Sequence, residues 1–164
     1  MKCVLITGLS GTGKSSLLRE LSERGFRVVD TDFDGWRVPP DGSAPDSTVA
    51  RPDWIWDGDR MRELLTEEVD GVLFVSGCVD NQGEFRDLFD EVILLSVPEQ
   101  TVRERLSSRA ADVYGGSPAD LERELKLREE VEPLLRESAT LELDTSGSLE
   151  VLADEVVGYI STSR

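Results

Sequence analysis

Short apolar runs alternate along the chain with longer segments in which apolar residues recur every three or four positions. The runs are rich in Val, Ile, Leu and Phe and predict buried β-strands, whereas the wider spacing predicts amphipathic helices. Strands are expected at about residues 2–7, 26–30, 71–76, 91–97 and 140–144. Helices are expected at about residues 14–24, 57–68, 82–89, 98–109, 118–138 and 149–160.

This alternation predicts one α/β domain over residues 1–164, with a parallel sheet covered by helices on both faces. Pro133 should kink or interrupt the helix at 118–138. Residues 31–56 contain four prolines and no clear period, so we expect a long irregular insert there. Ligands of such sheets bind beyond the carboxyl ends of the strands, so the candidate chemistry is sought there.

Composition narrows the function in a few ways. The 164 residues carry 18 basic and 34 acidic side chains, a net charge of −16, which argues against non-specific binding of nucleic acid. Two cysteines make no disulfide framework. No signal peptide and no membrane-spanning run is evident, so we expect a cytoplasmic protein. Without histidine, any acid–base step falls to a carboxylate, a lysine or water.

Residues 8–15 read Gly-Leu-Ser-Gly-Thr-Gly-Lys-Ser, the phosphate-binding P-loop pattern, between an expected strand and an expected helix. Backbone N–H groups of such a loop converge on phosphate oxygens, and the helix adds its positive N-terminal end. Lys14 should reach the β- and γ-phosphates, and the Ser15 hydroxyl should bind Mg²⁺. The residues expected to bind the nucleotide here are Gly8, Ser10, Gly11, Thr12, Gly13, Lys14, Ser15 and Ser16.

Other strand ends distinguish among P-loop proteins. The strand at 71–76 is followed by Gly77-Cys78, without the acidic residue that hydrolytic ATPases usually place there. The guanine-reading tetrapeptide Asn-Lys-x-Asp of GTPases is absent from the sequence. Asp30-Thr31-Asp32 follows the second expected strand instead. These features favour a small-molecule kinase over a motor-like ATPase or a GTPase.

With the P-loop, the Asp-x-Asp and the segment 132–139, the chain resembles the shikimate and gluconate kinase branch of the nucleoside monophosphate kinase superfamily. The resemblance implies a three-layer α/β/α P-loop NTPase fold whose five-stranded parallel sheet has the order 2-3-1-4-5. It implies an acceptor-binding insert at about 31–56 and a lid at about 105–118. It also implies the cofactors ATP and Mg²⁺.

By this resemblance, Asp30 would hold Mg²⁺ through water, and Asp32 would bind the acceptor hydroxyl and take its proton. Arg105 and Arg109 would contact the phosphates or the adenine. Thr145 and Ser146 would border the adenine pocket. The expected catalytic residues are therefore Lys14, Asp32 and Arg109. Both aspartates also suit turns, and the lid arginines also suit ion pairs along a charged helix.

The acceptor is less well specified. Shikimate kinases carry an arginine two residues before the proline of 132–139, where this chain has Val131. Arg37 and Arg51 are the basic groups of the insert that could hold an anionic acceptor. Its tryptophans, Trp36, Trp54 and Trp56, could form a stacking wall or a small core.

We therefore expect a kinase that moves the γ-phosphate of Mg·ATP to a hydroxyl of a small molecule. One alternative is a nucleoside or nucleoside monophosphate kinase. Another is a regulatory protein that binds ATP and turns it over slowly or not at all. No membrane partner is expected.

Overall fold

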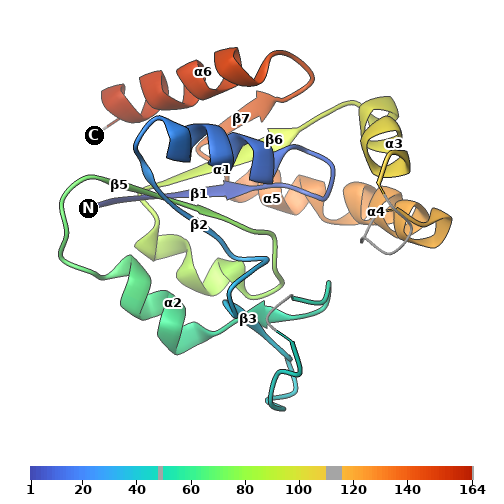
Figure 1. Cartoon of the computed structure of the whole chain (residues 1–164), viewed down its shortest axis with the longest axis horizontal. Coiled ribbons are helices and arrows are strands. Elements are labelled where there is room, and N and C mark those ends of the chain that lie inside the picture. Colours follow the sequence, from blue (N-terminus) through green and yellow to red (C-terminus); the bar gives the residue numbers. More distant parts are fainter. Residues whose placement is uncertain (48–49, 110–115, 164) are drawn as a thin grey trace.

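A computed structural model of the chain describes residues 1–47, 50–109 and 116–163 (Figure 1). Five strands form one sheet in the order β2-β5-β1-β6-β7, and every neighbouring pair is parallel. The strands are β1 Lys2–Thr7, β2 Arg27–Asp30, β5 Val72–Ser76, β6 Glu91–Ser96 and β7 Leu141–Asp144. Counted along the chain without the short β3 and β4, this is the order 2-3-1-4-5, which confirms the predicted P-loop NTPase topology.

The helices cover both faces of the sheet, with α1 and α6 on one face and α2 on the other (Figure 1). They are α1 Lys14–Glu23, α2 Gly58–Leu65, α3 Glu99–Ser107, α4 Pro118–Glu130, α5 Glu132–Ser138 and α6 Leu149–Thr162. The segment Gln82–Leu88 is a 3₁₀-helix, where the sequence predicted an ordinary helix. The predicted interruption near Pro133 is confirmed, because α4 ends at Glu130 and α5 begins at Glu132.

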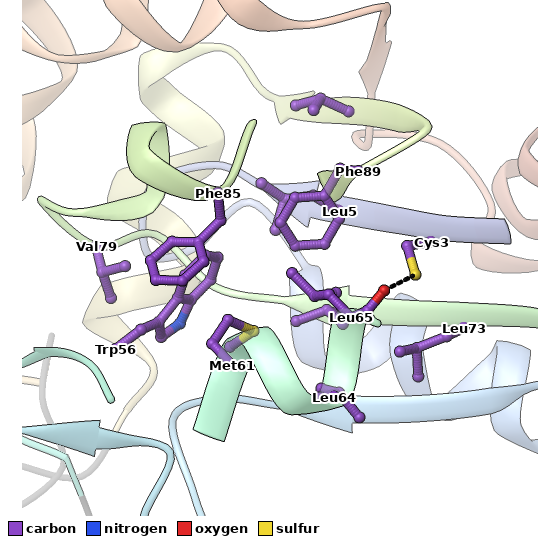
Figure 2. Close-up of a cluster of buried hydrophobic side chains, with 12 residues drawn as sticks. Cys3, Leu5, Trp56, Met61, Leu64, Leu65, Leu73, Val79, Phe85 and Phe89 are labelled. Carbon is purple, nitrogen blue, oxygen red and sulfur yellow. Dashed lines mark hydrogen bonds between the residues drawn. The ribbon is translucent and has the colours of Figure 1, made fainter. Parts of the chain in front are cut away.

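Two apolar clusters lie on opposite faces of the sheet because successive strand residues point in opposite directions. In β1, Val4 and Ile6 belong to the cluster that α1 and α6 cover, while Cys3 and Leu5 belong to the other. Figure 2 shows this second cluster, in which side chains of α2 and the 3₁₀-helix surround Trp56. The strands therefore form a layer that is buried on both faces, and the candidate site lies at their carboxyl ends.

The insert is less irregular than its sequence predicted. Within it, β3 Arg37–Val38 pairs antiparallel with β4 Ile55–Trp56. Asn81 mimics a further strand partner, since its Oδ1 accepts from the Trp56 backbone N at 3.0 Å and its Nδ2 donates to the Trp56 O at 3.1 Å. Strands of two residues are too short to show alternation, which explains why the pattern did not predict them.

The lid expected at about 105–118 falls partly on residues 110–115, which lie outside the described residues. Its described ends are the last turn of α3 and the start of α4, where Ser117 Oγ accepts from the Asp120 N–H at 3.2 Å. Within the described ranges, none of the helices is both long enough and apolar enough to cross a membrane.

Candidate active site

The P-loop connects β1 to α1 in a conformation that depends on its glycines. Gly11 and Gly13 have φ angles of 85° and 93°, in the left-handed region that side chains disfavour. A Cβ on Gly8 would lie 2.6 Å from the Leu95 carbonyl oxygen, so the loop approaches β6 closely. Lys14 folds back over the loop, and its Nζ donates to Gly8 O at 2.5 Å. Most of the predicted loop residues line the cavities described below, namely Ser10, Gly11, Gly13, Lys14, Ser15 and Ser16, whereas Gly8 and Thr12 do not.

Ser15 and Asp30 meet at the ends of α1 and β2. The Ser15 hydroxyl donates to Asp30 Oδ2 at 3.0 Å. Burial raises the pKa of Asp30, and hydrogen bonds from the Asp32 backbone and the Ser15 hydroxyl offset part of this effect. A hydroxyl and a carboxylate suit Mg²⁺, which takes one or two protein oxygens and keeps several waters. The described residues contain no group of three or more acidic, cysteine or histidine side chains that would form a full protein cage.

Asp32 lies at the start of the insert and pairs with Arg37 of β3. Arg37 Nη1 donates to Asp32 Oδ1 at 3.0 Å, and the arginine side chain is 7% exposed whereas that of the aspartate is 43% exposed. The Asp32 N–H donates to Asp30 Oδ1 at 3.1 Å, so the two acids of the motif share one turn. The sequence named Arg37 as a possible anion-binding residue, and the structure instead pairs it with the candidate base.

Arg105 of α3 bridges the P-loop and the end of β7. Its Nη1 donates to Gly11 O at 3.0 Å, and its Nη2 donates to Thr145 O at 2.6 Å. Thr145 in turn donates from Oγ1 to Thr12 O at 2.5 Å. Ser146 is exposed, and both its N–H and its hydroxyl donate to Asp144 Oδ1. Arg105 and Thr145 therefore belong to the wall of the site, whereas the Ser146 side chain is engaged in a local turn.

Two cavities adjoin at the P-loop. One, of about 430 Å³, lies between the loop, the end of α3 and the start of α6, and Arg105, Arg109 and Thr145 line it. The other, of about 560 Å³, lies toward the insert and α4, and Lys14, Asp32 and Arg109 are among its lining residues. The residues common to both are Gly11, Gly13, Ser16 and Arg109. One site thus has two adjoining cavities, each of several hundred cubic ångströms, that meet at the P-loop and at Arg109.

The three tryptophans are not among the described residues that line either cavity. Trp54 and Trp56 are buried, at 4% and 1% exposure, and the Trp56 Nε1–H donates to Thr31 Oγ1 at 2.9 Å. Trp36 is half-buried beneath the Arg60 guanidinium, whose carbon lies 3.8 Å from the ring centroid. Trp56 therefore belongs to the apolar cluster on the α2 face of the sheet, and Trp54 is buried as well, so neither of these two side chains is exposed for a ligand to stack on.

Two residues at the second cavity, Phe33 and Glu124, were not predicted from sequence. Cys78 also lines this cavity, as its place at the carboxyl end of a strand led us to expect. Cys78 follows β5, and burial raises the pKa of its thiol. Glu124 is a buried carboxylate in the middle of α4, a helix whose sequence is strongly charged throughout. Only its burial distinguishes Glu124 from its neighbours, and burial depends on how α4 packs in three dimensions.

The sequence matches one family model, described as an AAA domain, over residues 4–136. No curated protein matches the chain at a significant level.

Solved structures with similar folds include a shikimate kinase from Acinetobacter baumannii in complex with shikimate, with a TM-score of 0.65 and 20% identity over 100% of this chain and 95% of that one. A gluconokinase from Sinorhizobium meliloti 1021 has a TM-score of 0.61 and 19% identity, with 98% and 91% of the two chains covered. A sugar kinase from Janibacter sp. has a TM-score of 0.59 and 19% identity, with 98% and 95% covered. At these identities the likeness establishes the fold.

Proposed function

This chain belongs to the AAA-domain family, and from that premise we propose that it is an ATP-dependent kinase of a small hydroxylated molecule. The observation that carries the proposal is the pair of adjoining cavities, which meet at the P-loop and at Arg109. A nucleotide in the first cavity would present its γ-phosphate at the mouth of the second. Asp32 lines that second cavity and would act there as the base for the acceptor hydroxyl.

The reaction would be an in-line transfer. The acceptor oxygen forms a bond to the γ-phosphorus, the bond from that phosphorus to the β–γ bridging oxygen breaks, and ADP leaves. The hydroxyl proton passes to the Asp32 carboxylate, whose Oδ1 is already bound by Arg37. Lys14 and Arg109 would stabilise the charge that spreads over the transferring group.

Mg²⁺ would be bound by the Ser15 hydroxyl and, through water, by Asp30, and it would neutralise phosphate charge. Arg105 and Thr145 would enclose the adenine side of the first cavity. Much of the rate enhancement in such a site comes from positioning and from excluding water, so that the acceptor hydroxyl reacts in place of a water molecule.

The experiment that tests the proposal measures ADP release from Mg·ATP across a panel of sugars, polyols, other hydroxylated metabolites, nucleosides and nucleoside monophosphates. The Lys14→Ala variant is the blank, because loss of its charge should lower turnover at least about 100-fold. Acceptor-stimulated ADP release that requires Lys14 supports a kinase. ATP binding by calorimetry without stimulation by any member would contradict it and favour the regulatory protein. Turnover by Lys14→Ala at the wild-type rate would contradict the P-loop assignment.

A further inference from the structure

We propose that the acceptor carries hydroxyl or amine donors and no carboxylate or phosphate, and that Glu124 is the second protein carboxylate that binds it. This inference rests on the kinase function proposed above and concerns the acceptor side of the same site. The cavity there, of about 560 Å³, has the size of a small-molecule site. Two acidic side chains are among its lining residues, Asp32 from the insert and Glu124 from α4.

Arg37 is the basic residue of the insert that lines this cavity, and its donors are already engaged. Its Nε donates to Trp54 O at 3.0 Å, and its Nη2 donates to Arg51 O at 2.9 Å and Pro52 O at 3.0 Å. Its Nη1 donates to Asp32 at 3.0 Å. A buried guanidinium with four such partners ties the insert together, so it is not a free clamp for an anionic substrate.

The other two arginines near the insert are directed elsewhere. Arg51 pairs with Asp46 at 2.5 Å, with side chains 60% and 62% exposed, and it is not among the described lining residues. Arg60 donates to Asp34 O at 2.7 Å and stacks over Trp36. Neither provides the paired N–H groups that recognise a carboxylate or phosphate in the cavity.

The remaining cations have positions that suit the transferred phosphate or the solvent. Lys14 lies on the P-loop, with Nζ bound to the Gly8 and Leu9 carbonyls. Arg109 lines both cavities at their junction, where the γ-phosphate would lie. Arg123 lines the cavity but is exposed, so water screens its charge.

Glu124 differs from all of these cations because it is an acid, and it is almost fully enclosed, at 4% exposure. A carboxylate or phosphate on the acceptor would bring like charges together where the local dielectric is low, which is costly. An ammonium or hydroxyl group would instead donate a hydrogen bond to it. The net charge of −16 acts in the same direction, because it repels anions and attracts cations.

The test measures ADP release with sets of acceptors that share a carbon skeleton and differ in charge. Each set holds an amino sugar, the neutral sugar, the corresponding sugar acid and the sugar phosphate, with D-glucosamine, D-glucose, D-gluconate and glucose 6-phosphate as the first set. Stimulated ADP release confined to the amine and neutral members is the expected result. Stimulation by the acids or phosphates would overturn the inference and leave the kinase function standing. ATP binding without stimulation by any set or by any member of the wider panel would overturn the kinase function and this inference with it.

A variant then tests Glu124 with any active acceptor. Glu124→Gln keeps the shape and removes the charge, and it should raise KM for that acceptor about 10-fold or more while KM for ATP changes less than about twofold. It should also reduce the ratio of kcat/KM for the amine to kcat/KM for the neutral member of the same set. Glu122→Gln, on the exposed face of the same helix, is the matched control and should change neither value. An unchanged acceptor KM and preference in Glu124→Gln would overturn its role.

Discussion

Arg37 Nη1 and Asp32 Oδ1 lie 3.0 Å apart. Arg37 belongs to β3, which pairs with β4, and Asp32 follows β2, so this ion pair connects the small sheet of the insert to the end of β2. The guanidinium is buried and also binds three backbone carbonyls of residues 51–54. The candidate base is therefore bound by a residue that also connects several backbone carbonyls of the insert. We expect both the folding of the insert and the placement of Asp32 to depend on this side chain.

This relationship predicts a double effect of Arg37→Met. Loss of the guanidinium would leave several carbonyls without their donor and Asp32 without its partner. We expect the free energy of unfolding to fall by about 2–4 kcal/mol. We also expect a lower kcat, because Asp32 would lose the partner that positions it. Urea unfolding and steady-state kinetics measure the two effects. Arg51→Met is the matched control, because its exposed pair with Asp46 contributes at most about 1 kcal/mol. Equal effects of the two substitutions would contradict the role given to Arg37.

Asp32→Asn tests the base directly. The amide keeps the size of the side chain and can still accept from Arg37, but it cannot take a proton. We expect phosphoryl transfer to fall about 100-fold or more, while ATP affinity measured by calorimetry is nearly unchanged. An equal loss of ATP affinity would instead place Asp32 chiefly at the metal.

The sequence was most informative where the chemistry is local. The P-loop and the Asp-x-Asp each lie next to a strand that its apolar run identifies, so both motifs could be placed at the carboxyl edge of the sheet. The strand order came from the resemblance, and the structure confirms it. Pro133 likewise acts on its own helix and was correctly interpreted.

The acceptor side was harder to predict because its residues come together only through long-range packing. Arg37 looked like a free cation in the sequence, and its partners at 51–54 become visible only once β3 and β4 pair. Trp56 looked like a possible ligand platform, yet it lies in the core between Phe85 and Phe89. Glu124 is one acid among many on α4. No period or motif distinguishes such residues before the helix is docked.

Gly77 provides a test of how closely the Asp-x-Asp motif packs against the residues that follow β5. A Cβ there would lie 2.4 Å from Thr31 Oγ1 and 3.2 Å from the Trp56 ring. Gly77→Ala should therefore displace Thr31, which separates the two acids, and we expect a loss of about 1–3 kcal/mol in stability together with a lower kcat. Thermal unfolding and kinetics measure both.

Gly83→Ala is the matched control for that substitution, because nothing lies within 4 Å of its Cβ position. It should be neutral or stabilise the fold by up to about 1 kcal/mol. A Gly77→Ala protein as stable and active as Gly83→Ala would show that the contact at Thr31 relaxes without consequence.

The pH dependence of stability should reveal the buried carboxyl of Asp30. Its pKa is raised by burial above the usual value of 3.8, so the folded state binds a proton more readily than the unfolded chain does. Ionised Asp30 therefore costs stability, and this cost appears as pH rises from the unfolded pKa through the folded one. Asp30→Asn should make the nucleotide-free protein more stable at pH 7, by a margin that shrinks toward pH 4 and below. Bound Mg·ATP should raise the melting temperature of the wild type more than that of the variant. If the difference in stability between Asp30→Asn and the wild type stays constant with pH, the buried charge of Asp30 is not its cause.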